Sequence, residues 1–520
     1  MTVSRPDPAA IGSAAEHFGL SFDDADREEF ASLVDGALGS YDVVDELYET
    51  IAPNAHDREH HTVSSTDNVL GAWYVKTSIT SSAPTDDRLA GKTVAIKDNV
   101  AVAGVPMTNG SRTLEGFVPA RDATVVTRLL DSGAEIVGKS VCEDLCFSGS
   151  SFTPSTGPVR NPWDPTREAG GSSGGSGALV AAGEVDIAIG GDQGGSIRIP
   201  AAFCGVVGHK PTFGLVPYTG GFPIERTIDH LGPITRTVAD AALMLSVIAG
   251  YDGNDPRQPD DLTAGDYTLG LDAGVDNLRI GVVTEGFGHE NSSPEVDDTV
   301  RAAVQRFIDL GASVEEVSIP WHRHAFHVWN VIATDGAAYQ MLDGNGYGLN
   351  VEGLYDPEQM AYFAARRLEQ ADALSETVKL VALCGYHGVS TLGAASYGKA
   401  RNLVPTARAA YDAALDTFDV LVMPTLPYTA TDLPGPDIDR ATYLTTALGM
   451  IANTAPFDVT GHPALSVPAG LVGGLPVGMM IIGKHFDDAT VLKVGHSFEK
   501  LIGGFPTPAG ASDRAELTTL

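Results

Sequence analysis

Residues 168–180 read EAGGSSGGSGALV, and residues 190–205 read GGDQGGSIRIPAAFCG. By composition alone both stretches resemble flexible linkers, because Gly and Ser dominate them. The sequences that flank them indicate ordered structure instead. The first stretch continues into the apolar residues 178–182, and the second follows the strand-like sequence VDIAI at 185–189. Two Gly-Ser clusters joined by sequence suited to a buried strand predict tight backbone turns beside a packed core.

The second cluster predicts a reactive serine. A buried strand leads into Gly-Gly-Ser and then into a helix containing Pro200, so Ser196 is placed at a strand end. Backbone N–H groups of residues 193–196 could converge there on an oxyanion, as acyl transfer requires. A nucleophilic serine needs a base, and residues 168–205 contain no histidine. Lys97, which ends an apolar strand, could serve as that base.

Lys97 can act as a base only if its amine is unprotonated. We expect Lys97 to be neutral in the resting protein, because an ammonium group cannot accept a proton. A carboxylate close to the amine would favour the charged form. Asp98 follows directly in the chain, and the alternation of side chains along a strand should turn it away from Lys97.

The pattern of elements predicts an α/β fold. Helical segments at 122–133, 238–250 and 488–503 alternate with short apolar runs that are typical of strands. We therefore predict a mixed, mostly parallel β-sheet flanked by helices. The expected strands lie at 93–100, 134–140, 185–192, 278–285, 419–424 and 477–483.

The pattern of elements also predicts three regions. Residues 1–82 are expected to form an N-terminal helical domain, in which Gly36 and Gly39 separate two helices. Residues 83–335 and 441–520 are expected to form the α/β core. Residues 336–440 are expected to form a small domain, a helical insertion that covers one edge of the core and shapes a substrate pocket.

Composition limits the partners and the compartment. The 520 residues carry a formal net charge of −34, which disfavours nucleic acid and anionic membranes. We find no apolar run long enough for a transmembrane span and no signal-peptide pattern. Four cysteines are too few for a disulfide framework in a chain of this length. These features predict a cytoplasmic protein without a metal site.

Four motifs occur in a defined order: VAIKDN at 94–99, AGGSSGGSGA at 169–178, GGDQGGSIRIPAAFCG at 190–205 and GHKPTFG at 208–214. Together they resemble the amidase signature family. With EDLCFSGSS at 143–151 and the N-terminal helices, the chain is similar to the bacterial enantioselective amidases associated with nitrile breakdown. The resemblance implies the amidase signature fold and hydrolysis of a carboxylic acid amide to the acid and ammonia, without a cofactor.

The resemblance also assigns roles in a Ser-Ser-Lys triad. Ser196 would be the acyl-enzyme nucleophile and Lys97 the general base and acid. Ser172, expected on a cis peptide bond after Gly171, would bridge the two. The remaining expected site residues are Ser173, which would support the network; Gln193, Gly194, Gly195 and Ser196, which would supply oxyanion N–H groups; and Cys146 or Phe147, which would border the acyl pocket.

One position departs from the pattern and leaves alternatives open. Many family members carry a small or aliphatic residue where this chain has Gln193, whose side chain could bind the substrate amide or point away. The alternative function is the amidase subunit of a tRNA-dependent amidotransferase. Ile199 stands where such subunits often carry Gln, which weakens this alternative. A non-catalytic binding protein on the same scaffold is disfavoured by the intact triad residues.

Apolar residues and the N-terminal segment give expectations for the substrate and the oligomeric state. Phe147, Trp329, Leu448 and Ile451 could form a hydrophobic pocket, which favours aromatic or branched aliphatic amides over charged ones as substrates. The N-terminal segment is amphipathic and lies outside the catalytic motifs. We therefore expect a homodimer that forms partly through the first 80 residues.

Overall fold

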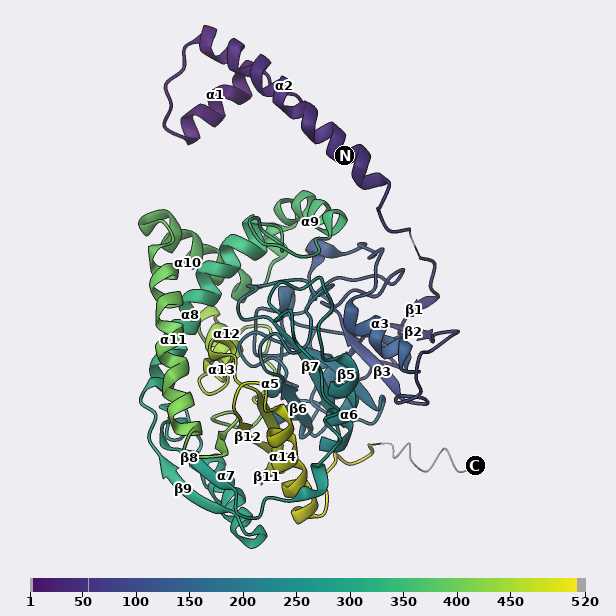
Figure 1. The fold of residues 1–520 in the computed structure, drawn as a ribbon, viewed down its shortest axis with the longest axis vertical. Coiled ribbons are helices and arrows are strands. Elements are labelled where there is room, and N and C mark those ends of the chain that lie inside the picture. The colour runs from purple at the N-terminus through teal and green to yellow at the C-terminus, as the bar shows by residue number, and fades with distance from the viewer. Residues whose placement is uncertain (1–2, 55, 512–520) are drawn as a thin grey trace. The chain divides into compact units, whose positions relative to one another are not determined.

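The computed structural model describes residues 3–54 and 56–511. The chain divides into two compact units, Met1–Ala55 and His56–Leu520. The first unit contains two helices (Figure 1), α1 (Pro8–His17) and α2 (Asp24–Glu49).

Helix α2 differs from the prediction. It runs without a break through Gly36 and Gly39, so the expected division into two helices is wrong. Glycine in a helix interior costs about 1 kcal/mol relative to alanine but does not prevent helical geometry. The helix begins with a capping box at Asp23, which satisfies free N–H groups of the first turn.

The second unit is built on one twelve-stranded sheet, in the order β1-β2-β4-β3-β5-β7-β6-β11-β12-β10-β8-β9. Its strands are β1 (His60–Thr62), β2 (Trp73–Ile79), β3 (Thr93–Lys97), β4 (Glu135–Ser140), β5 (Ile187–Asp192), β6 (Val207–Lys210), β7 (His230–Thr235), β8 (Arg279–Val283), β9 (Ser313–Val317), β10 (Val420–Pro424), β11 (Ala464–Val472) and β12 (Leu475–Ile482).

Helices flank this sheet. They are α3 (Thr124–Asp131), α4 (Gly174–Ala181), α5 (Arg198–Cys204), α6 (Val238–Ile248), α7 (Pro294–Gln305), α8 (Trp321–Gly336), α9 (Pro357–Glu369), α10 (Glu376–Leu392), α11 (Ala395–Leu415), α12 (Arg440–Leu448), α13 (Pro456–Thr460) and α14 (Asp488–Ile502). Within the described ranges, no helix combines the length and the apolar character needed to cross a bilayer.

Side-chain alternation along the central strands separates two apolar cores. In β3, Val94 and Ile96 join the core formed with α3, α6, α7 and α14, whereas Ala95 joins the core formed with α4. Strand β5 alternates in the same way. Because side chains two residues apart share a face, Lys97 lies on the same face as Ala95, towards α4. The strand geometry therefore directs Lys97 towards the Gly-Ser turn that begins α4.

The sheet is mixed, as predicted, but it is not mostly parallel. Of the eleven strand pairings described, only β3–β4, β3–β5, β8–β10 and β8–β9 are parallel. The strands that the sequence pattern does not predict create most of the antiparallel pairs. Strands β11 and β12, for example, form a hairpin around Gly473 and Gly474, whose positive φ angles suit a tight turn.

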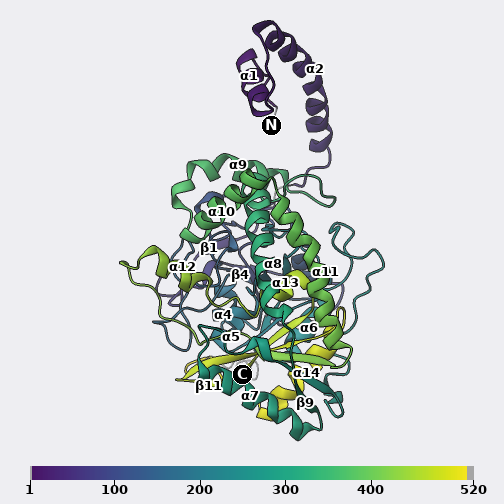
Figure 2. The ribbon, with the colours of Figure 1, turned by 90° about the vertical axis from the view of Figure 1, so that its left-hand side faces the viewer.

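The predicted region boundaries also differ from the structure. The sequence pattern places residues 60–79 in a helical N-terminal domain ending at 82, but they form β1 and β2 at one edge of the sheet. The alternating burial along β2 explains this strand. The expected insertion 336–440 contains α9, α10 and α11, and also the buried strand β10. Helix α8 packs against α10 and α11, and Figures 1 and 2 show the three side by side.

Candidate active site

Strand β3 delivers Lys97 to a buried serine. Lys97 Nζ lies 2.8 Å from Ser172 Oγ and 3.2 Å from the carbonyl oxygen of Gly191. Both side chains are fully buried. Asp98 faces elsewhere, as predicted: its carboxylate lies 2.9 Å from Lys139 Nζ. The amine of Lys97 is therefore placed beside a hydroxyl and a carbonyl, while the neighbouring carboxylate is paired with another lysine.

The Gly-Ser turn before α4 packs against the end of β5. The expected cis peptide bond between Gly171 and Ser172 is present. A side chain at Gly171 would overlap a backbone oxygen, so this position requires glycine. Ser173 contacts the backbone of Gly191 twice, through the N–H at 3.2 Å and the carbonyl at 3.1 Å, and its own N–H donates to the Ser196 carbonyl at 3.3 Å. These bonds fix the two serine-containing turns against each other.

The turn that carries Ser196 is folded around a carboxylate. Asp192, the last residue of β5, accepts hydrogen bonds from Gly195 N at 2.6 Å and from Ile197 N at 3.0 Å. The Gly195 N–H is thus already used, so its predicted role as an oxyanion donor is wrong for this structure. A side chain at Gly195 would also overlap Thr454 Oγ1, and the φ angle of +136° is one that favours glycine.

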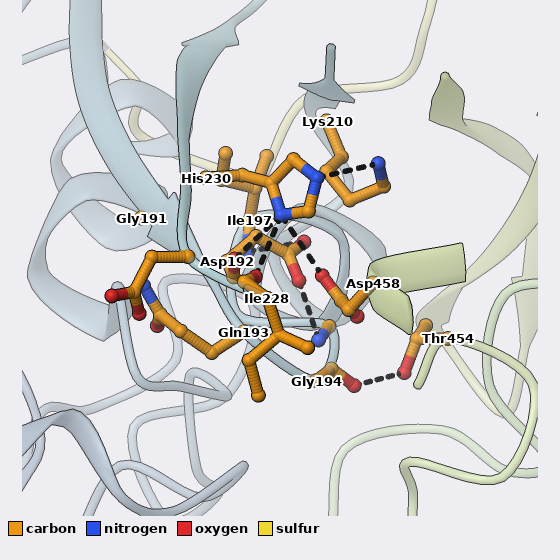
Figure 3. Close-up of polar contacts among 12 residues, drawn as sticks. Gly191, Asp192, Gln193, Gly194, Ile197, Lys210, Ile228, His230, Thr454 and Asp458 are labelled. Carbon is orange, nitrogen blue, oxygen red and sulfur yellow. Dashed lines mark hydrogen bonds and ion pairs between the residues drawn. The ribbon is translucent and has the colours of Figure 1, made fainter. Parts of the chain in front are cut away.

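A buried network of charges supports this turn. Figure 3 shows part of it: Asp192 and Asp458 lie beside His230, whose Nδ1 is 3.5 Å from Asp458 Oδ1. Arg198 binds Asp192 through two nitrogens at 3.0 Å each and Asp458 Oδ2 at 2.9 Å. Burial opposes ionisation of Asp192, but the Arg198 guanidinium holds the pKa of that carboxyl well below its usual range. Burial and the neighbouring Asp192 raise the pKa of Asp458 well above its usual range. The ionised Asp192 is therefore held rigidly where it can order the backbone N–H groups of the turn.

Two further side chains fix the peptide planes before Ser196. Thr454 Oγ1 donates to the Gly194 carbonyl at 2.6 Å, and Trp329 Nε1 donates to the Gln193 carbonyl at 2.6 Å. Because each peptide is planar, holding its carbonyl also fixes the direction of the N–H that follows it.

Ser196 and the turn line a cavity whose lining is mostly apolar, as is usual for small-molecule sites. Each of the sequence-predicted pocket residues lines it. The lining residues are Cys146, Phe147, Ser148, Gly149, Gln193, Gly194, Ser196, Ile199, Ile224, Ile228, Trp329, Ala333, Leu448 and Ile451.

The side chain of Gln193 is anchored at one end only. Its Nε2 donates to Tyr218 Oη at 3.1 Å, and that hydroxyl in turn donates to the Phe222 carbonyl. Asn99 also donates to the same hydroxyl. The other end, Gln193 Oε1, is buried at the cavity without a hydrogen-bond partner. An unpaired buried acceptor beside Ser196 suits a ligand that brings an N–H group.

Comparison with known proteins agrees with this geometry. A family model described as Amidase matches residues 42–492. The chain belongs to the amidase signature family. Over 518 residues it is 58% identical to an enantioselective amidase of Rhodococcus rhodochrous, with 98% of each chain covered.

Solved structures share the fold of the amidase. The crystal structure of a glutamyl-tRNA(Gln) amidotransferase component from Thermotoga maritima matches with a TM-score of 0.71 and 32% identity, covering 86% of this chain and 92% of that chain. A bacterial aryl acylamidase of the amidase signature family matches with a TM-score of 0.65 and 30% identity, covering 80% and 83%. The protein therefore has the amidase signature fold and is a hydrolase that acts on amide C–N bonds.

Sequence reasoning does not reveal one acidic side chain of the amidase site. The Glu143 N–H donates to the Ser172 carbonyl at 3.1 Å, and the Glu143 carboxyl accepts bonds from the hydroxyls of Ser150 and Thr153 at 2.8 Å each. Burial raises the pKa of Glu143 from 4.5 to about 8. The surrounding serines and threonines are the signal that could have found it, because such hydroxyl clusters often satisfy a buried acid.

The raised pKa of Glu143 predicts how stability depends on pH. Between pH 4.5 and about 8 the folded chain keeps the Glu143 proton, whereas the unfolded chain loses it. The free energy of unfolding should then fall by about 1.4 kcal/mol per pH unit from this group alone. In Glu143→Gln this component is absent, so the melting temperature should decline less from pH 5 to pH 8 than in the wild type. Glu46→Gln on the exposed surface of α2 is the control. Equal pH slopes for wild type and Glu143→Gln would contradict the assignment.

Proposed function

We propose that this amidase hydrolyses a carboxylic acid amide to the acid and ammonia through an acyl ester on Ser196. The observation that carries the proposal is the 2.8 Å contact between the buried Lys97 amine and Ser172, beside the ordered turn of Ser196. No histidine takes part: a Ser-Ser-Lys triad performs the proton transfers.

In the first half-reaction, Ser196 Oγ attacks the amide carbonyl carbon, and its proton passes through Ser172 to the Lys97 amine. The backbone N–H groups of Gln193, Gly194 and Ser196 stabilise the oxyanion. When the C–N bond breaks, Lys97 returns the proton through Ser172 to the departing nitrogen, and ammonia leaves. Water then attacks the acyl ester by the same proton route, which releases the acid and restores Ser196.

The cavity supports aromatic or branched aliphatic acyl groups. Phe147, Trp329, Leu448 and Ile451 give it apolar walls, which suit an uncharged aromatic or branched acyl group. Gln193 Oε1 is the acceptor for an N–H of the substrate amide, since it is buried there without another partner. The enzyme binds its substrate through apolar contacts to the acyl group and this hydrogen bond to the amide.

Gln193→Met should separate binding from chemistry. The variant retains the volume of the side chain but lacks the acceptor, and one lost hydrogen bond corresponds to about a tenfold rise in KM for an amide. An ester of the same acid has no N–H group, so its KM should change much less. Steady-state kinetics on the matched amide and ester test this. Equal effects on the two substrates would contradict a hydrogen bond from the amide.

The purified chain alone should release ammonia from a panel of aromatic and branched aliphatic amides. This experiment also tests the alternative, because an amidotransferase subunit would need a partner that accepts the ammonia. Ammonia release that appears only with a partner protein and a charged tRNA would contradict the proposal and favour the alternative.

We also propose that the amidase forms a homodimer in the cytoplasm. Helix α2 exposes a row of apolar side chains, including Leu33, Val43, Val44 and Leu47, each more than half exposed. A second copy that covers them would remove this apolar surface from water. The four cysteines are all free, as expected for a reducing compartment.

Charge on α2 should disrupt such a dimer. We expect the wild type to show the mass of two chains in light scattering and the double variant Val44→Glu, Leu47→Glu to show the mass of one, because an apolar interface disfavours unpaired carboxylates. Glu46→Ala, between the two positions, is the matched control and should remain dimeric. A wild type with the mass of one chain refutes the dimer.

A further inference from the structure

Three potential metal ligands lie close together in space, and all three come later in the sequence than the triad residues. Asp412 belongs to α11, His462 follows α13, and His485 follows β12. One ligand atom from each lies within 4.8 Å of the others. His462 Nε2 is 3.1 Å from Asp412 Oδ1, and His485 Nδ1 is 3.8 Å from the same oxygen. Three segments that are distant in sequence thus bring two imidazole nitrogens and a carboxylate oxygen to one point.

The outer nitrogens of both rings are held by one residue. His485 Nε2 lies 2.8 Å from the Thr460 carbonyl, and His462 Nδ1 lies 3.0 Å from Thr460 Oγ1. Metal-binding histidines almost always have such a partner on the second nitrogen, which fixes the ring and its tautomer. The two rings are 4.1 Å apart between centroids, so they face the same space.

The tautomer of His485 leaves a lone pair on the nitrogen that faces Asp412. A carbonyl can only accept, so the proton of neutral His485 is on Nε2 and its Nδ1 is a bare lone pair. That lone pair faces Asp412 Oδ1, which is also an acceptor. Two acceptors that face each other are stabilised by a cation between them.

We propose that Asp412, His462 and His485 form a binding site for a divalent transition metal ion of the zinc type. Two imidazoles and a carboxylate suit Zn²⁺ better than Ca²⁺ or Mg²⁺, which prefer oxygen ligands. Tetrahedral Zn²⁺ with bonds of 2.0–2.1 Å places its ligand atoms about 3.4 Å apart. The separations of 3.1 and 3.8 Å to Asp412 need only small side-chain adjustments to reach that value.

The proposed metal site is open to solvent on one side and lies between three segments of the fold. His462 is fully buried, whereas half of the Asp412 side chain is exposed, so an ion can enter from solvent and keep a water as its fourth ligand. Thr460, which holds both rings, ends α13, and the same helix carries Asp458, a partner of Arg198. A bound ion would join α11 to the turns after α13 and β12, and so stabilise the folded chain without taking part in the acyl chemistry.

The test is to dialyse the full chain against a chelator and then titrate it with Zn²⁺. Calorimetry measures the binding, and the melting temperature is measured at each Zn²⁺ concentration. We expect one equivalent of Zn²⁺ per chain and a melting temperature that rises with free Zn²⁺. In Asp412→Asn and His485→Gln the affinity should fall by about 10- to 100-fold or more. His496→Gln is the matched control: His496 also lies beside an aspartate, Asp272, at 3.2 Å, but outside the cluster.

Co²⁺ is a second probe, and it distinguishes binding at the proposed site from binding of metal ions elsewhere on the protein surface. Co²⁺ in a tetrahedral site with nitrogen ligands gives intense visible absorption, which should appear in the wild type and in His496→Gln but not in His485→Gln. Because His485 is only partly buried, its variant is expected to fold even if a change at His462 does not. Zn²⁺ affinity that is equal in wild type and His485→Gln, or wild type that binds no stoichiometric Zn²⁺, overturns the proposal.

Discussion

Ser196→Ala should abolish ammonia release from every amide that the wild type accepts, with kcat reduced at least about 10⁴-fold. The reason is that Ser196 is the hydroxyl that the ordered turn after β5 presents to the cavity. The change removes one oxygen and leaves the backbone bonds to Asp192 intact, so the fold should be retained. Circular dichroism and the melting temperature check the fold, and an ammonia assay checks the rate.

A buried serine outside the site is the control for this variant. The Ser246 hydroxyl in α6 donates to the Ala242 carbonyl and accepts from Tyr267 N. Ser246→Ala should therefore cost stability but keep its catalytic rate. Residual activity of Ser196→Ala above a few per cent of wild type would show that another group is the nucleophile.

Lys97→Ala and Lys97→Arg should both lose most of the rate, by about 10²- to 10⁴-fold. Alanine removes the base, and arginine stays protonated and cannot accept a proton from Ser172. Arginine carries a fixed positive charge, so its failure would distinguish a proton acceptor from a fixed cation. The ammonia assay is again the measurement, with stability measured in parallel.

The matched control is the other buried lysine on the neighbouring strand. Lys139 Nζ lies 2.9 Å from Asp98, and an arginine can maintain that pair. Lys139→Arg should therefore keep far more activity than Lys97→Arg. Near-full activity in Lys97→Arg would exclude Lys97 as the base.

The site can be predicted from the sequence to the extent that short motifs define local geometry. The contact between Lys97 and Ser172 joins residues 75 positions apart, yet the motifs point to both. Gly195 shows where this reasoning fails. A carboxylate three residues earlier, at Asp192, takes its N–H by the side-chain-to-backbone bonding typical of such a spacing, and a motif alone does not reveal this competition.

The fold is predictable where strands are apolar and β-branched. Strands such as β3, β5 and β8 are evident in the sequence because their burial leaves a clear pattern. Strand β7, with the sequence HLGPIT, is fully buried, but His, Gly and Pro conceal it from pattern analysis. Pairing direction depends on which segments meet in space, so the antiparallel half of the sheet cannot be derived from local sequence. The Asp412, His462 and His485 cluster escapes sequence analysis for the same reason.

The central claim is that the reaction passes through an acyl ester on Ser196. The most direct measurement is rapid acid quenching of the enzyme during turnover of a slowly hydrolysed amide, followed by mass spectrometry of the peptide that contains Ser196. We expect an adduct with the mass of the acyl group on Ser196, which disappears when hydroxylamine is added and a hydroxamate forms. An adduct on Cys146 or another residue, or turnover without any adduct under conditions where deacylation limits the rate, would contradict it.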